Sequence, residues 1–519
     1  MRNSVLFTIL VVVIIIFSLP TLFLLSFSGT THNEIAPRSA TTVDTNRYLK
    51  KPASDLTTIE DFNNDLFLAI DQKKKFSLMH VDALLNKDGH FQKCEYETSY
   101  RGFKEIYSVC DRCFGDVCDA FSFVTIFEHK KLETSILLLR NIGMNVKRIK
   151  CIGGGEDVHS VFRREEDEIP TFKYGSFLME GNKYCANHKV SLDVKLSLYQ
   201  KAILYSLDFY DSYPDIPTCQ YVPIPTIFIT RYEYANLWHV VTDFYNTFLT
   251  LRVANLVERD PQTKHWVVRP HQIIWLDAHA KGNLDDAWIF LFQSANVTRL
   301  HSWVENVQQN SLSDCVSLFA ESWVVPAGHE SPMENFDLYG CREQTGAWRE
   351  FISFVTDRVE IPPFTSRKII LVLRRDYVSH PRNQRGTVYR KISNEQEVVE
   401  AIQTIPCVSG FAVDFSTLSF QEQAKMVGSA NILVGLHGAG LTHAIWMDKR
   451  ATLLEIPLED EQPHFGMTSK FSGINYISRG LTKKVDDYYY HVFTEPLVKQ
   501  ISHILSDAVC ISDDEFVVL

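Results

Sequence analysis

The stretch Asn431-Ile-Leu-Val-Gly-Leu-His-Gly-Ala-Gly440 decides the fold, because it joins a short apolar run to a glycine-rich turn. A short uninterrupted apolar run is typical of a strand that is buried on both faces of a parallel sheet. The apolar residues Leu441 to Met447 come next and predict a helix. The stretch therefore predicts a strand, a tight turn and a helix in immediate succession.

The sequence on either side repeats this alternation. Further apolar runs predict three more strands, at Lys368 to Arg374, Phe411 to Phe415 and Ala451 to Ile456. Two capping boxes predict the helices between strands, Ser393-Asn-Glu-Gln396 with a helix to about Thr404 and Ser419-Phe-Gln-Glu422 with a helix to about Val427. Strands that alternate with helices over short connections indicate a doubly wound α/β sheet.

The first half of the chain shows the same pattern more weakly. Strands are expected at Thr226 to Thr230 and Gln272 to Leu276, around a long aromatic helix from about Tyr234. This part of the chain therefore predicts a second α/β lobe.

We expect the N-terminal lobe to span residues 61–363 and a C-terminal Rossmann-like lobe to span residues 364–519. The Pro362-Pro363 pair is the candidate hinge between them. A ligand would lie in the cleft between the lobes, at the carboxyl ends of the strands.

Composition limits the class of protein. The chain has 519 residues, of which 45% are hydrophobic and 22% charged, which is ordinary for folded globular protein. The formal net charge is −11 and no long Lys/Arg block occurs, so the basic surface of a nucleic-acid-binding protein is missing.

The N-terminus contains the strongest compositional signal. Val5 to Phe27 is a run of 23 uncharged residues, long enough as a helix to cross a hydrocarbon layer of about 30 Å. We expect a cytoplasmic tail at residues 1–4, a transmembrane signal-anchor at 5–27 and a stem at 28–60. A signal peptide cleaved after Ser18-Leu19-Pro20 is the alternative.

Eleven cysteines bear on the compartment of the folded body. Cys94 with Cys110, Cys113 and Cys118 could bind zinc in a cytosolic protein, but beyond a membrane span the same crowding favours disulfides. The sequon Asn296-Val297-Thr298 fits the same luminal location as a glycosylation acceptor. We expect most cysteines to be paired and at least one to be free.

The glycine-rich turn is the candidate diphosphate-binding site. Glycines let the backbone approach a ligand, and free N–H groups at a helix start bind anions such as a diphosphate. The candidate residues of the turn are His437, Gly438, Ala439, Gly440 and Thr442. A tight turn that needs glycine only for its dihedral angles is the alternative.

Two residues outside the turn point to the same ligand. Arg374 and Arg375 close a strand, so one of them should face the cleft as a cation for phosphate. Glu455 ends another strand, where a carboxylate can accept both ribose hydroxyls of a nucleotide. A surface ion pair and a solvated carboxylate are the corresponding alternatives.

A polar stripe on the aromatic helix is the candidate catalytic site. Asn236, His239, Asp243 and Asn246 recur at three- and four-residue spacing among large apolar residues. His239 and Asp243 can pair, with the carboxylate orienting the imidazole as a general base. Reversed roles, or a buried pair that only ties elements together, are the alternatives.

Several stretches together resemble glycosyltransferase family 61, and within it the N-glycan β1,2-xylosyltransferase branch. The matching stretches lie in family order and comprise Thr230 to Asn246, Arg374 to Arg382, Leu418 to Gln423, Gly435 to Met447 and Gln462-Pro-His-Phe465. The resemblance implies a type II Golgi or endoplasmic reticulum anchor, two Rossmann-like lobes of GT-B type, a UDP-sugar donor and inversion at the anomeric carbon.

The absence of any Asp-x-Asp sequence agrees with that resemblance, since a metal-clamped diphosphate is then not indicated. We expect no metal and no cofactor, and a UDP leaving group stabilised by arginine and backbone N–H groups. The expected reaction is xylose transfer from UDP-xylose to the core mannose of an N-glycan in the Golgi. N-acetylglucosamine transfer to protein Ser/Thr or O-mannose, and an inactive glycan-binding relative, are the alternatives.

Overall fold

The computed structural model describes residues 103–108, 123–130, 132–162, 164, 169–180, 195–210, 218–293, 296–310, 315–328, 331, 333, 346–458, 464–508, 510 and 516–518. The expected tail, anchor and stem, residues 1–60, lie outside these ranges. Within the described ranges, no helix has the length and apolar character that a membrane span requires.

The C-terminal sheet is parallel throughout and has the order β20-β19-β18-β15-β17-β23. Its strands are β15 (Lys368–Leu373), β17 (Ser409–Asp414), β18 (Ile432–Leu436), β19 (Thr452–Ile456), β20 (Asn475–Ser478) and β23 (Phe516–Val518). Chain order reverses between β15 and β18, which makes their carboxyl ends the topological switch point of a doubly wound sheet. The predicted alternation of strands and helices is confirmed here.

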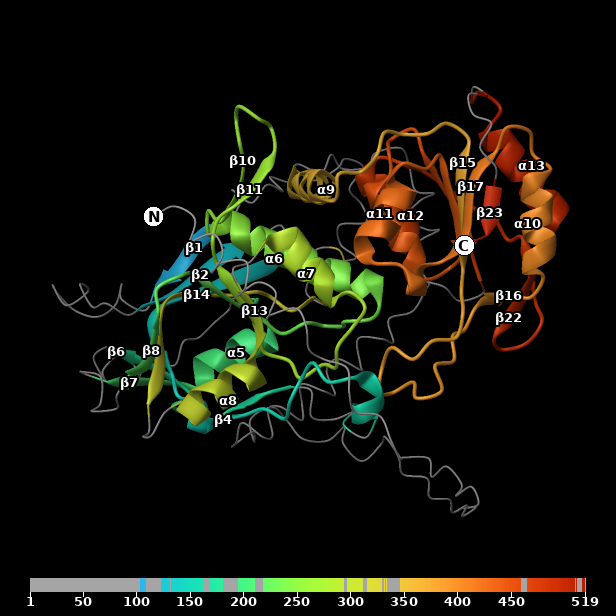
Figure 1. Ribbon diagram of the computed structural model, residues 1–519. Helices are drawn as coiled ribbons and strands as arrows, with labels where there is room; N and C mark the ends of the chain where they lie inside the picture. Colours follow the sequence, from blue (N-terminus) through green and yellow to red (C-terminus); the bar gives the residue numbers. More distant parts are fainter. Residues whose placement is uncertain are drawn as a thin grey trace, which may run out of the picture. The chain divides into compact units, whose positions relative to one another are not determined.

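Helices cover both faces of this sheet (Figure 1). α10 (Glu395–Gln403) and α13 (Thr494–Ile504) lie on one face, and α11 (Phe420–Gly428) and α12 (His464–Ser472) on the other. Alternate side chains of β15 explain why both faces are apolar: Ile369 packs with the α10 and α13 side, whereas Ile370 packs with the α11 side.

The two predicted capping boxes have different outcomes. Ser419 accepts a hydrogen bond from Glu422 N and forms a complete box at the start of α11, as predicted. The box predicted at Ser393 is wrong, because the residue before α10 is Asn394. The Asn394 amide instead donates to Val492 O (2.9 Å) and accepts from Val492 N (2.9 Å), so it is used to hold the neighbouring strand.

The N-terminal sheet has ten strands and is mixed. Its central strands have the order β14-β9-β12-β13 and are parallel, and β3 joins β14 antiparallel, followed by β2 and β1. β8 also pairs with β14 in parallel, and β6 pairs with β7 in parallel at the edge of the sheet. A fully Rossmann-type lobe was expected, and the structure restricts that arrangement to the four central strands. The remaining strands form hairpins and edge pairs, whose short or alternating runs the apolar pattern did not reveal.

The strands of this sheet are β1 (Lys104–Ser108), β2 (Phe123–His129), β3 (Thr134–Met144), β6 (Phe177–Glu180), β7 (Leu207–Tyr210), β8 (Thr218–Val222), β9 (Thr226–Ile229), β12 (Gln272–Trp275), β13 (Asn296–Arg299) and β14 (Val316–Val324). Short strands elsewhere are β4 (Ile149–Lys150), β5 (Thr171–Phe172), β10 (Val257–Arg259), β11 (Trp266–Val268), β16 (Lys391–Ile392), β21 (Thr482–Lys484) and β22 (Tyr489–Val492). The other helices are α5 (Leu198–Tyr205), α6 (Leu237–Val253), α7 (Asp285–Phe292), α8 (Leu300–Asn310) and α9 (Gly346–Val359), with 3₁₀ helices η7 (Val146–Arg148), η8 (Val158–Val161), η11 (Phe415–Thr417) and η12 (Ala439–Trp446).

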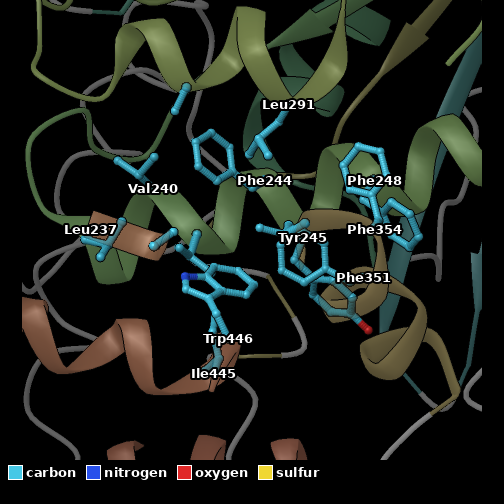
Figure 2. Close-up of a cluster of buried hydrophobic side chains, with 14 of the residues drawn as sticks. Leu237, Val240, Phe244, Tyr245, Phe248, Leu291, Phe351, Phe354, Ile445 and Trp446 are labelled. Carbon is cyan, nitrogen blue, oxygen red and sulfur yellow. The ribbon is translucent and has the colours of Figure 1, made fainter. Parts of the chain in front are cut away.

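One apolar core joins the helices that follow the two sheets (Figure 2). Phe244 and Tyr245 of α6, Phe351 of α9 and Trp446 of η12 all belong to it. α9 contacts α6 and α7 as well as α11 and α12. Residues Leu56–Leu519 form one unit, so the division into lobes at 363/364 stays a prediction.

Two disulfides confirm the disulfide interpretation for four of the cysteines, Cys219 with Cys315 and Cys407 with Cys510. Cys151 is a free thiol, as expected of at least one cysteine. Cys94 and the group from Cys110 to Cys118 lie outside the described residues.

Candidate active site

Arg374 and the glycine-rich turn meet at the switch point of the C-terminal sheet. Arg374 follows β15, and Gly438 follows β18. A side chain on Gly438 would place its Cβ 1.7 Å from Arg374 Nη1, so only glycine leaves room for the guanidinium against the turn. Arg375 is exposed and forms an ion pair with Glu395. The two side chains therefore diverge, with Arg374 at the turn, and its expected contact with phosphate stays a prediction.

His437 is held by a buried hydrogen-bond chain. Its Nδ1 lies 2.5 Å from Glu455 Oε1, and Tyr476 donates its hydroxyl to Glu455 Oε2 at 2.6 Å. Burial, with the Glu455 charge, raises the pKa of Tyr476, which keeps it a donor. Both Glu455 oxygens thus have partners within the protein, and the residue is 2% exposed. Neither oxygen is placed as the expected contact with ribose hydroxyls requires. Glu455 orients His437 instead.

The turn continues into a 3₁₀ helix, η12, where an ordinary helix was expected. Its first bond runs from Leu441 N to Gly438 O (2.9 Å), which leaves the N–H groups of Ala439 and Gly440 ahead of it for other partners. Gly440 faces inward, because a Cβ there would lie 2.9 Å from Val372 Cγ1. A side chain there would therefore meet the core, and the expected approach of the Gly440 backbone to a ligand stays a prediction.

Two polar side chains of η12 are fully buried. The Thr442 hydroxyl has no hydrogen-bond partner within the described part of the chain and is shielded from solvent. His443 lies 2.7 Å from Gln423 Oε1 through its Nε2, and burial lowers the pKa of His443 to about 3. His443 is therefore a neutral structural histidine, and Thr442 lies behind the turn surface.

Asp243 on α6 is buried completely and does not hydrogen-bond with His239. Its Oδ2 accepts from Tyr232 N at 2.8 Å, and Oδ1 has no partner among the described residues. Gly328 makes room for this carboxyl, because a Cβ there would lie 2.4 Å from Asp243 Oδ1. The expected His239–Asp243 pair is corrected, since the carboxyl fixes the loop before α6 instead.

Burial also decides the charge of this group. It raises the pKa of Asp243 well above its ordinary value, with the Tyr232 N–H acting in the opposite direction. His239 is partly exposed, and its ring packs edge-on against Tyr232 at 4.6 Å between centroids. Of the two predicted catalytic residues, only His239 reaches a surface that a substrate could contact.

Residues that sequence patterns missed surround His239. Glu233 lies between Tyr232 and Tyr234 in the loop from β9 to α6, and the Tyr234 ring contacts His279 (4.7 Å) and His380 (5.4 Å). A loop has no periodicity, so spacing could not single these residues out. The signal present was the family-like stretches that contain Glu233 and His380.

A buried network of charges supports this loop. Arg231 is 1% exposed, donates to Asp277 (2.7 Å) and Asp285 (2.6 Å), and lies over the Trp275 ring at 3.9 Å. Arg299 also donates to Asp285 at 2.8 Å. Burial alone would raise the pKa of Asp277, but Arg231 and His279 hold it below its ordinary value. The network is satisfied and fixes the carboxyl ends of β9 and β12.

Aromatic contacts connect α6 with α12 and with the glycine-rich turn. Trp238 of α6 packs against His464 of α12 at 4.5 Å, and His464 contacts His437 at 5.1 Å. Burial, together with the nearby His437 and His239, lowers the pKa of His464 to about 3. Gln384 Nε2 also donates to Phe162 O at 2.9 Å. Residues that follow the two sheets are therefore in direct contact here.

Two remaining expectations concern glycosylation and metal. Asn296 begins β13 and is exposed, which leaves the sequon accessible. Among the described residues, no group of three or more His, Cys, Asp or Glu side chains has an arrangement that could hold a metal ion.

Comparison with known proteins identifies the class. The family model described as Glycosyltransferase 61 matches residues 237–454, which run from α6 to β19 and include the turn. The resemblance to this family is thereby confirmed over the matched region.

Particular relatives refine the comparison. A beta-1,2-xylosyltransferase of Arabidopsis thaliana is 25% identical over 430 residues, which cover 68% of this chain and 75% of the relative. Beta-1,2-xylosyltransferase RCN11 of Oryza sativa subsp. japonica is 26% identical, over 66% of this chain and 67% of its own. An EGF domain-specific O-linked N-acetylglucosamine transferase of Mus musculus is 27% identical over 50% of this chain and 46% of its own.

Proposed function

We propose that this protein is an inverting glycosyltransferase that moves xylose from UDP-xylose, in β1,2 linkage, to the core mannose of N-glycans. The observation that supports the donor site is the position of Arg374 against Gly438 at the switch point. A fixed guanidinium beside free N–H groups neutralises the charge that develops on a departing diphosphate. His437, oriented by Glu455, adds a ring nitrogen at the same place.

The choice of xylose rests on the two plant xylosyltransferases, which align with about two thirds of the chain. The second candidate is N-acetylglucosamine transfer to protein Ser/Thr, which the EGF domain-specific relatives favour over a shorter stretch. We further propose a type II Golgi membrane protein with a luminal body, which the two disulfides and the exposed sequon support.

A donor and acceptor screen tests the function. The purified body would be incubated with UDP-xylose or UDP-N-acetylglucosamine, and with an N-glycan core or a Ser/Thr peptide from an EGF domain. Transfer of xylose to the glycan, with a β1,2 linkage by NMR, is expected. N-acetylglucosamine transfer to the peptide would select the second candidate, and binding without transfer would indicate an inactive relative.

The donor site has its own test in a matched pair of variants. Arg374→Ala should weaken UDP binding about ten- to a hundredfold, since a charge-assisted contact contributes about 1.5 to 3 kcal/mol. Arg375→Ala should leave UDP binding unchanged, because its partner is Glu395 on the exposed side. Calorimetry with UDP measures both, and equal affinities would remove Arg374 from the donor site.

A further inference from the structure

Glu233 is an acidic residue at the carboxyl end of a central strand of the N-terminal sheet. It lies in the loop directly after β9, at the point where chain order reverses between β9 and β14 in the N-terminal sheet. In open α/β sheets, ligands bind at such a point. Its chain neighbours Tyr232 and Tyr234 pack against His239 on one side and against His279 and His380 on the other.

The Glu233 carboxylate is fixed through one oxygen. Oε1 accepts from Tyr234 N at 2.8 Å and from Ala235 N at 3.3 Å. Oε2 accepts no hydrogen bond from any residue that the structure describes, and the side chain is only half-buried. One oxygen is therefore anchored to the backbone, and the other is left for a proton donor.

The surroundings of Glu233 keep it ionised. Burial by itself would raise its pKa, but His380, His279, the Tyr234 N–H and His239 together hold the pKa of Glu233 below its ordinary value. The histidines come from different parts of the chain, since His380 follows β15 and His279 follows β12. The carboxylate can accept a proton at any pH above the acidic range.

Glu233 lies beside the segment that begins with Arg374. Val378 packs against the apolar cluster that contains Tyr234, and the His380 ring lies 5.4 Å from the Tyr234 ring. The segment that carries the candidate donor cation therefore passes next to the chain neighbour of Glu233.

We propose that Glu233, and not His239, is the general base of the transfer, acting through Oε2 on the acceptor hydroxyl. The inference rests on the proposed glycosyltransferase function. The acceptor proton moves to Oε2 while the acceptor oxygen bonds to the anomeric carbon. The bond from that carbon to the diphosphate breaks, and its electron pair leaves with UDP beside Arg374. Inversion follows from this single displacement.

The other candidates are less suited to this role. Asp243 is fully buried and cannot touch an acceptor. The His380 ring packs beside Arg382, with Nδ1 3.1 Å from Arg382 N, and is not left for an acceptor. His239 is a positioning residue, because its ring packs edge-on against Tyr232, the chain neighbour of Glu233.

The experiment compares Glu233→Gln, Glu233→Asp and His239→Gln, with Glu395→Gln as a surface carboxylate control. Each variant is assayed for transfer, UDP affinity and melting temperature. Glu233→Gln should lose about 10² to 10⁴ in kcat with UDP affinity unchanged. Glu233→Asp, which keeps a carboxylate, should retain more activity, and Glu395→Gln should match the wild type.

The pH profile separates the two bases without depending on a variant. With Glu233 as base, wild-type kcat/KM should fall on the acidic side of the profile only below about pH 4.5. A histidine base would place this acid limb at about pH 6.5. An acid limb near 6.5 that disappears in His239→Gln, or near-native transfer by Glu233→Gln, would overturn the proposal. Absence of transfer by the wild type with every donor would overturn the function and the base assignment with it.

Discussion

Gly438 and Gly440 are two residues apart and have opposite roles. Gly438→Ala would displace the Arg374 guanidinium, because the new Cβ would occupy the place of Nη1. We expect UDP affinity to fall at least tenfold while the melting temperature holds, since a charge-assisted contact is lost at the surface. Calorimetry and thermal unfolding of the same samples measure the two quantities.

Gly440→Ala is the matched control for this prediction. Its Cβ would meet Val372 and Phe415 in the interior, and overpacking of this kind costs about 1 to 3 kcal/mol of unfolding free energy. Here the melting temperature should fall, and UDP affinity of the folded fraction should change less than in Gly438→Ala. The reverse pattern would mean that Gly440 faces the donor.

Asp243 gives a prediction about stability and pH. Burial raises the pKa of Asp243 in the folded protein. Above the ordinary carboxyl range the unfolded chain has lost this proton, so folding takes up a proton from solution. The protonated carboxyl therefore adds to the unfolding free energy. This contribution is complete below the pKa of the unfolded chain, about 3.9, and is lost as pH rises through the folded pKa. Asp243→Asn has no such group, so its stability relative to the wild type should improve with rising pH.

Urea unfolding of both proteins at several pH values above 4 measures that difference. A constant difference across the series would contradict the raised pKa. Improvement with falling pH would mean that Asp243 is held as a carboxylate in the folded protein, as a partner of a charged His239 would be.

Helix caps show how a single residue sets the start of an element. Ser419→Ala should lower the unfolding free energy by about 1 kcal/mol, because Ser419 accepts from Glu422 N at the start of α11. Ser393→Ala should have almost no effect, since Ser393 is exposed and Asn394 precedes α10. Chemical denaturation of the two variants checks this, and equal losses would restore the predicted box at Ser393.

The elements of the C-terminal sheet could be predicted because each central strand is buried on both faces. β15, β18 and β19 therefore appear as plain apolar runs, and the bounds predicted for β15 and β19 differ from the observed ones by one residue. η12 was predicted as an ordinary helix because apolar content alone does not distinguish it from a 3₁₀ helix. β14 was missed, since buried and half-buried residues mix along it.

The same reasoning explains which site residues could be predicted. Arg374 and His437 directly follow apolar strands, so topology alone places them at the switch point. Glu233 follows β9 as well, but its role depends on His279 and His380, which lie far away in the sequence. Such a role depends on tertiary packing, and spacing along the chain does not express it.

At the scale of the whole molecule, the two sheets share a core. Trp446 of η12 is 2% exposed and contacts Phe351 of α9 at 5.8 Å, in the same cluster as Phe244 of α6 (Figure 2). A cluster that packs against both sheets couples their unfolding, in contrast to two lobes joined only by a hinge. We therefore expect both sheets to unfold in one transition.

Trp446→Ala should then destabilise both sheets together, by about 3 to 5 kcal/mol for a buried tryptophan. Trp446→Phe should cost less, because it keeps most of the ring and removes a buried N–H that has no partner among the described residues. Hydrogen exchange in increasing urea, followed on peptides from β9 and from β18, measures the coupling. In each protein the two peptides should lose protection at the same urea concentration. Protection that persists in β18 after β9 has exchanged would show that the sheets unfold independently. Something other than the shared core would then hold the two halves of the proposed site together.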